Sequence, residues 1–93
     1  MSLDQLRAVV TIAEEGTLVR AARRLHISQP PLTRKVRALE DELQVALFHR
    51  GAHGMRLTPA GEAFLGPART ILAAVDQATH AARAASRRDR PPR

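Results

Sequence analysis

Apolar positions recur every three or four residues at the start of the chain, which is the spacing that places them on one face of an α-helix. They are Leu3, Leu6, Val9, Val10 and Ala13. Ser2 is placed to cap this helix, with Gln5 three residues later as a capping-box partner. Gly16 is placed to end it. The pattern therefore predicts a first helix over about residues 3–15.

A second, shorter helix is predicted over residues 18–25, with Thr17 as its N-cap. Its inward stripe consists of Leu18, Ala21, Ala22 and Leu25. The alanines in this stripe are small enough to let another helix approach closely. His26 and Ile27 form the short turn that follows.

The third helix, predicted over residues 28–43, opens with a polar first turn that contains two prolines. Pro30 and Pro31 are tolerated there because the first N–H groups of a helix have no partner within it. The pair therefore fixes the helix boundary close to Ser28, the expected cap. The buried face is expected to consist of Leu32, Val36, Leu39 and Leu43. Two short helices joined by a tight turn in this way form the layout of a DNA-reading helix-turn-helix.

Residues 47–58 change character and predict a β-hairpin. Two strands are expected at LFHR, 47–50, and MRLT, 55–58, around the turn GAHG at 51–54. Strands this short do not persist alone, so the hairpin is expected to pack beside the helix-turn-helix as a wing.

A long helix is expected from Thr58-Pro59, a cap followed by a proline, to about residue 88, a length of ~45 Å. Pro67 is expected to remove one of its backbone hydrogen bonds. Apolar residues at alternating spacings of four and three form a heptad seam. They are Phe64, Ala68, Ile71, Val75, Ala78 and Ala82, continuing to Ala85. A helix of this length exceeds its own small domain, so the seam is expected to pair two copies, with a thin contact where it is alanine-only.

Composition narrows the class of protein. The 93 residues contain no cysteine, which excludes a disulfide framework and a thiolate metal site. There is no signal-peptide pattern and no apolar run of the ~20 residues that a bilayer requires, so we expect a cytoplasmic protein that is not embedded in a membrane. Lys and Arg number 15 against 9 acidic residues, a net charge of +6 that favours a polyanionic partner. Because residues 83–93 carry +4 of that charge, a solvated basic tail explains it equally well.

Two stretches of the chain resemble the N-terminal DNA-binding region of LysR-type transcriptional regulators. They are LRAVVTIAEEGTLVRAARRLHISQPPLTRKVRALEDELQVALFHR at 6–50 and RLTPAGEAFL at 56–65. The resemblance covers roughly residues 1–88. It implies a mostly α fold, a winged helix-turn-helix of three helices plus a two-stranded wing, followed by a long linker helix that pairs antiparallel in a homodimer. It also implies a C-terminal domain that binds a small-molecule effector and is not contained in these 93 residues.

The expected organisation is a DNA-binding domain at 1–58, a linker and dimerisation helix at 59–88 and a disordered tail at 89–93. The helix at 28–43 would enter the major groove with its N-terminus first, because its acidic residues lie at the other end. The wing at 50–56 would reach the minor groove.

Arg34 is the best candidate for reading a base, because it lies opposite the buried stripe and arginine pairs with guanine in two hydrogen bonds. An exposed surface arginine is the alternative. The resemblance implies base or backbone roles for Gln29, Pro30, Pro31, Thr33 and Arg34. Further expected DNA-binding residues, each with a structural alternative, are Thr17 and Ser28 as caps, Arg37, Arg50 and His53. The last of these stands where family wings usually carry Arg or Lys.

Other functions fit less of the sequence. The four histidines lack the spacing of metal ligands, and no catalytic motif is present, so neither a metal, a cofactor nor an enzymatic activity is expected. A pure dimerisation module would leave the polar first turn at 28–31 unexplained. A membrane-surface helix would need more basic residues before Arg83. We therefore expect a dimer that binds an interrupted inverted repeat in double-stranded DNA and controls bacterial transcription.

Overall fold

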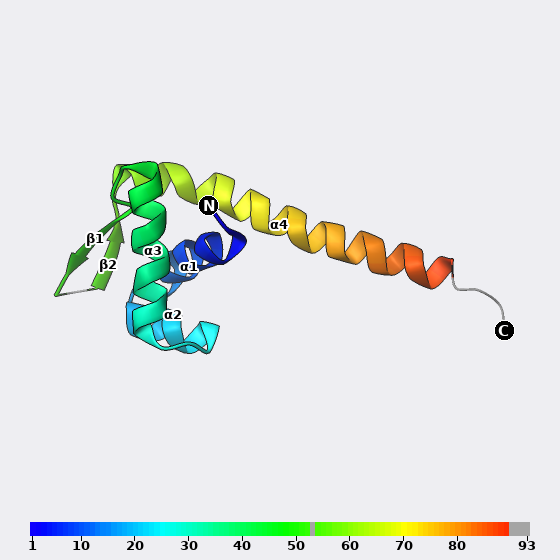
Figure 1. Ribbon diagram of the computed structural model, residues 1–93, viewed down its shortest axis with the longest axis horizontal. Helices are drawn as coiled ribbons and strands as arrows, with labels where there is room; N and C mark the ends of the chain where they lie inside the picture. The colour runs from blue at the N-terminus through cyan, green and yellow to red at the C-terminus, as the bar shows by residue number, and fades with distance from the viewer. Residues whose placement is uncertain (53, 90–93) are drawn as a thin grey trace.

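The computed structural model describes residues 1–52 and 54–89, which form a small helical head and one long projecting helix (Figure 1). The elements in chain order are α1 (Leu3–Glu15), α2 (Leu18–Leu25), α3 (Gln29–Leu43), β1 (Phe48–Gly51), β2 (Gly54–Leu57) and α4 (Pro59–Arg88). The head contains α1, α2, α3 and the hairpin, whereas most of α4 extends away from it. The molecule measures 61 × 25 × 19 Å as a result. This is the predicted mostly α winged helix-turn-helix with a long final helix.

The ends of α1 and α2 form where the sequence predicts them. Both hydrogen bonds of the capping box between Ser2 and Gln5 are present, and Gly16 closes α1 with a φ of 83°. The hydroxyl of Thr17 accepts a hydrogen bond from the N–H of Arg20 and caps α2. These contacts lie within one turn of sequence, which is why the residue order alone specifies them.

The turn between α2 and α3 lies at His26 and Ile27, as predicted, and its geometry depends on His26. His26 adopts the left-handed conformation, with a φ of 57° and a ψ of 40°. The N–H of the following Ile27 then bonds to the carbonyl of Ala22 at 3.0 Å. Ser28 occupies the N-cap position of α3 as predicted, but in the described part of the chain its hydroxyl makes no capping hydrogen bond. That part of the prediction is wrong, and the hydroxyl keeps its acceptor capacity.

The core lies between the three helices of the head and the start of the wing. Its buried members include Val9, Ile12, Ala21, Ala22, Leu32, Val36, Leu39, Leu47 and Phe48. The buried face predicted for α3 is confirmed, with its last member, Leu43, only half-buried at the edge. Ala21 and Ala22 are buried, as their place on the predicted inward stripe led us to expect.

The wing is an antiparallel pair whose register joins Phe48 to Leu57 and Gly51 to Gly54. Each strand therefore lies one residue nearer the turn than predicted. Leu47 and Thr58 still share one hydrogen bond, from Thr58 N–H to Leu47 C=O at 3.0 Å, but the N–H of Leu47 donates to Glu40 instead and Thr58 already caps α4.

The start of α4 is locked against the segment before the wing. The hydroxyl of Thr58 donates to the carbonyl of Ala46 at 2.6 Å and accepts from the N–H of Gly61 at 3.0 Å. A Cβ at Gly61 would collide with the carbonyl oxygen of Leu47, so only glycine fits there. Within the sequence TPAG at 58–61, Thr58 therefore caps α4 and Gly61 allows the close packing.

The predicted dimer seam is wrong at Ala68, whereas its first position, Phe64, stays a prediction. Ala68 is only 1% exposed, because it packs on Leu6 and Val10 of α1 in its own chain. Phe64 is half-buried and packs against the same residues and against the main core. Alternating spacings of four and three identify an apolar face, but they do not distinguish a face covered by the same chain from one covered by a partner.

Candidate nucleic-acid interface

The N-terminal half of α3 presents a polar surface opposite its buried stripe. Ser28, Gln29, Pro30, Arg34 and Arg37 are exposed, and Pro31 and Thr33 are half-exposed. The structure therefore brings all seven predicted α3 residues together at one end of one helix. Since a proline carries no N–H, the first turn offers fewer backbone donors to a phosphate than an ordinary helix end, and side chains must supply the rest.

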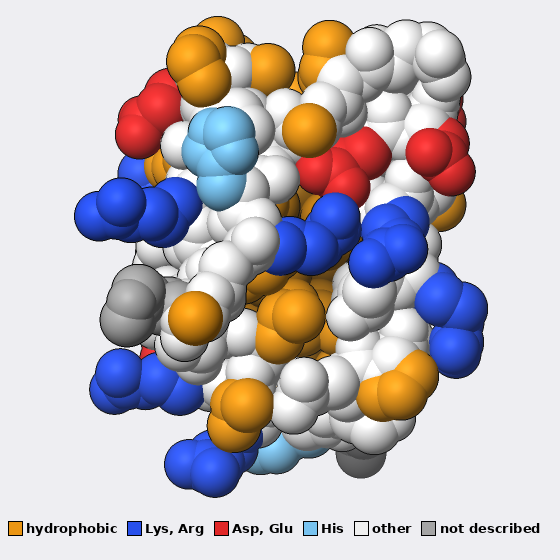
Figure 2. Space-filling view, turned by 90° about the vertical axis from the view of Figure 1, so that its left-hand side faces the viewer, with side chains coloured by type: hydrophobic (Ala, Val, Ile, Leu, Met, Phe, Trp, Pro, Cys, Tyr) orange, Lys and Arg blue, Asp and Glu red, His pale blue; other side chains and the backbone are white. Residues whose placement is uncertain are grey.

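Charge is graded along this face of the molecule. Figure 2 shows Lys and Arg side chains across the middle and lower part of the face formed by α3 and the wing, with most acidic side chains nearer the upper edge. That edge is the C-terminal end of α3 in Figure 1, where Glu40, Asp41 and Glu42 lie. A polyanion approaching this face would thus meet the basic N-terminal half of the helix and avoid its acidic end.

Glu40 is a functional neighbour of the wing that sequence reasoning missed. Its carboxylate accepts hydrogen bonds from the N–H of Leu47 at 2.7 Å, the N–H of Phe48 at 3.4 Å and the guanidinium of Arg50 at 3.1 Å. The side chain of Glu40 is only 10% exposed. An acidic residue in the run Glu40-Asp41-Glu42 gives no local signal for contacts seven to ten residues away.

Arg50 is accordingly held in the structural role that was one of its two predicted alternatives, with its side chain 35% exposed. Arg56 is exposed on β2 and pairs in register with His49 on β1. His53, the predicted minor-groove residue, lies outside the described residues.

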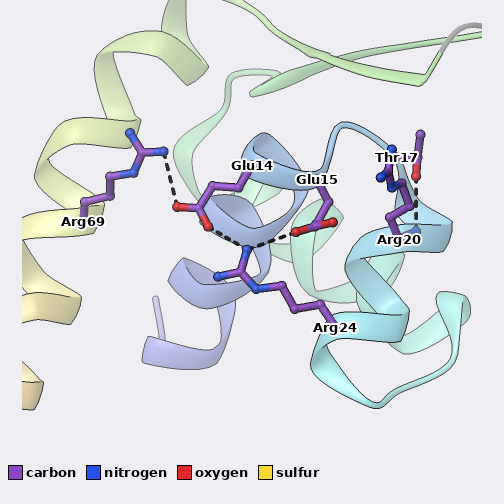
Figure 3. A network of polar contacts seen from close by, with 6 residues as sticks. All are labelled: Glu14, Glu15, Thr17, Arg20, Arg24 and Arg69. Carbon is purple, nitrogen blue, oxygen red and sulfur yellow. Dashed lines mark hydrogen bonds and ion pairs between the residues drawn. The ribbon is translucent and has the colours of Figure 1, made fainter.

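A network of charged side chains joins α1 to α2 and α4 behind the α3 surface (Figure 3). The carboxylate of Glu14 binds the guanidinium of Arg24 on α2 at 2.6 Å and that of Arg69 on α4 at 3.4 Å. Glu15 adds a second contact to Arg24 at 3.3 Å. The hydrogen bond from Arg24, together with the charges of both arginines, holds the pKa of the Glu14 carboxyl below its ordinary value of 4.5, despite partial desolvation.

Along α4, the predicted seam is most accessible beyond the head. Ile71 is 43% exposed, Val75 is half-exposed, and Ala78 and Ala82 are exposed. These four residues leave a narrow apolar stripe on the projecting part of the helix.

Residues 3–62 match the family described as "Bacterial regulatory helix-turn-helix protein, lysR family". The chain belongs to this family. Among curated LysR-family relatives it is 55% identical over 87 residues to the HTH-type transcriptional regulator TfdS of Cupriavidus pinatubonensis (strain JMP 134 / LMG 1197), covering 94% of this chain and 30% of TfdS. It is 51% identical over 87 residues to ClcR of Pseudomonas putida, with the same coverage. The chain thus spans about a third of the length of these relatives.

Solved structures of the LysR family show the same fold. The domain in the "CbnR_DBD-DNA complex" is 45% identical, with a TM-score of 0.86 over 92% of this chain and 99% of that chain. The domain in the "BenM_DBD/catB site 1 DNA Complex" is 37% identical, with a TM-score of 0.89 over 92% of this chain and 97% of that chain. Among residues 1–52 and 54–89, no helix combines the length and the apolar character needed to cross a bilayer.

Proposed function

We propose that this chain binds double-stranded DNA in a sequence-specific way, as the DNA-binding part of a bacterial transcription regulator that acts in the cytoplasm. The similarity to the DNA-bound domain of CbnR over nearly the whole of both chains supports this proposal best. The relatives are transcriptional regulators, so we assign the chain a binding role and no catalytic one.

In the proposed complex, α3 enters the major groove with its N-terminal half. Arg34 would pair with guanine, Gln29 with adenine, and Thr33 and the proline rings would contact thymine methyl groups. Further polar side chains near this surface would bind phosphates. The proposed residues are the exposed Ser28 and Arg37, together with Thr17, which also caps α2, Arg50, which also pairs with Glu40, and His53 of the wing at the minor groove.

The proposed active form is a homodimer joined through α4. Its seam is revised to Ile71, Val75, Ala78 and Ala82, with the half-buried Phe64 at its edge, because Ala68 is covered by the head. Two-fold symmetry then requires half-sites of opposite sense, which makes the proposed target an interrupted inverted repeat. Within a longer regulator, a small-molecule effector would act through a further domain, with residues 1–58 as the reading unit and 59–88 as the linker.

Selection from a randomised pool of double-stranded DNA tests this function directly. The enriched duplex and a scrambled duplex of equal composition are then compared by fluorescence anisotropy at two salt concentrations. We expect ~10³-fold tighter binding to the enriched duplex, and scrambled-duplex binding that weakens steeply with salt. A pool that enriches no motif, or equal affinity for both duplexes, would refute sequence-specific binding.

A further inference from the structure

One carboxylate links the helix-turn-helix to the long helix. Glu14 stands near the end of α1, one turn after Val10, and binds Arg24 of α2 and Arg69 of α4 at the same time. Figure 3 shows the two guanidinium groups reaching Glu14 from different helices on different sides. The two ion pairs therefore connect α4, through Glu14 of α1, to α2, which is the first helix of the helix-turn-helix.

The rest of the contact between α4 and α1 is apolar. Its buried centre is formed by Leu6, Val10 and Ala68, flanked by Phe64, Leu65 and Leu72. The hydrophobic effect has no preferred direction, so such a contact resists separation more than it resists rotation or sliding. A charge-assisted hydrogen bond has a preferred geometry. The pair between Glu14 and Arg69, at the margin of the apolar centre, is therefore suited to fix the angle at which α4 leaves the head.

The length of α4 amplifies any change in that angle. From Arg69 to the last helical residue, Arg88, the helix extends ~29 Å at 1.5 Å per residue. A tilt of ~5° at Arg69 moves the far end by ~2.5 Å, which is a large part of the ~3.4 Å between successive base pairs. In a dimer joined through this part of α4, a small tilt would change the separation of the two α3 helices by a similar amount.

We propose that Glu14 is a positioning residue that sets the angle between the helix-turn-helix and α4, and thereby the half-site spacing that the dimer prefers. The proposal rests on dimeric DNA binding as the function. Glu14 need not touch DNA: it acts through Arg24 on one side and Arg69 on the other.

The test measures spacing preference separately from half-site affinity, with the full 93-residue chain. One probe carries a single selected half-site. The others carry two inverted half-sites whose separation changes by one base pair at a time over a full helical turn, ~10 base pairs. The variants are Glu14→Gln, which removes the carboxylate charge that both arginines bind, and Arg69→Gln, which removes only the ion pair to α4. Asp4→Asn is the matched control, because its pair with Arg7 stays within α1.

We expect every protein to bind the single half-site within about twofold of the wild type, because α3 is unchanged. The wild type should prefer its best spacing over the next by ~10-fold, the change produced by a modest free-energy difference. Glu14→Gln and Arg69→Gln should each reduce this ratio to ~3-fold or less, and the double variant should reduce it no further because both act on one pair. Asp4→Asn should keep the wild-type profile.

Unchanged spacing profiles in both variants would overturn the proposal, as would a loss on the single half-site as large as the loss on the repeats. A wild type that binds the single half-site but gains nothing at any spacing would also overturn it while leaving DNA binding intact. A wild type that binds no half-site would instead refute the proposed function itself.

Discussion

The carboxylate of Glu40 and the guanidinium of Arg50 form an ion pair of 3.1 Å that joins α3 to the wing. The same carboxylate accepts the N–H groups of Leu47 and Phe48, so it also fixes the chain just before β1. One nearly buried acidic side chain thus aligns the two elements that are proposed to contact the two grooves of DNA.

Replacing Glu40 by alanine should destabilise the domain by ~1–3 kcal/mol. The reason is that the N–H of Leu47 loses its acceptor at a poorly accessible site. The measurement is the free energy of unfolding from urea denaturation. Asp41→Ala, at an exposed position on the same helix, should change it by no more than ~0.5 kcal/mol. Equal effects of the two substitutions would contradict the role given to Glu40.

Two glycines of α4 should respond very differently to alanine. Gly61→Ala should lower the melting temperature, because its Cβ would overlap the carbonyl oxygen of Leu47 and the side chain of Leu57. Gly66→Ala should change stability far less: apart from its chain neighbours and its own helix backbone, a Cβ there meets no described atom within 4 Å, and the helix propensity gained by alanine is opposed by crowding of that Cβ against Pro67. Thermal unfolding followed by circular dichroism decides both. A stable Gly61→Ala would show that the contact at the start of α4 is looser than described.

Arg34→Ala should cost ~1–3 kcal/mol of binding to the selected DNA, the usual worth of a two-hydrogen-bond base contact. Binding to scrambled DNA should fall much less. Arg37→Ala, on the same exposed helix surface, should weaken binding to both duplexes alike, as expected for a phosphate contact. Fluorescence anisotropy with both duplexes gives the four affinities. Equal losses for Arg34→Ala on the two duplexes would show that Arg34 contacts the DNA backbone and not a base.

Charging the exposed stripe of α4 should separate the dimer without unfolding the head. The double substitution Ile71→Glu with Val75→Glu places four carboxylates, two from each chain, in the proposed contact. Sedimentation should show a monomer, with binding reduced to that of a single half-site. Ala73→Glu with Gln77→Glu adds the same charge on another side of the helix and should leave the dimer intact. A wild type that stays monomeric at high concentration, or a seam variant that stays dimeric, would show that α4 is not the dimer contact.

Acid should selectively remove the contribution of Glu14 to stability. Its pKa is lower in the folded chain than the ordinary value of 4.5, so the unfolded chain binds more protons in that range. The contribution is therefore fully present above the ordinary pKa and is lost as the pH falls through the lowered one. Urea denaturation of the wild type and Glu14→Gln should show a difference that is largest near pH 7 and shrinks below about pH 4.5. A difference that does not vary with pH would show that the Glu14 carboxylate charge does not cause the loss of stability.

Sequence determined the elements of this fold because their signals are local. Ser2 with Gln5, and Thr17 with Arg20, satisfy backbone groups within one turn, and the proline pair at 30–31 restricts where α3 can begin. Apolar periodicity then identified the face of α3 that is buried, and hence the polar face proposed to read DNA. These relationships hold for a helix in isolation, so residue order suffices to predict them.

Only the tertiary structure decided which distant groups meet. Glu14 finds Arg24 and Arg69, ten and fifty-five residues away, and Glu40 reaches the wing, although neither glutamate differs in sequence context from a solvated surface residue. Helical spacing placed Ala68 in the predicted dimer seam, because this spacing identifies an apolar face but not the chain that covers it. The packing of α4 on α1 assigned that residue to the core of its own chain, whereas Ile71 stays 43% exposed and Val75 half-exposed.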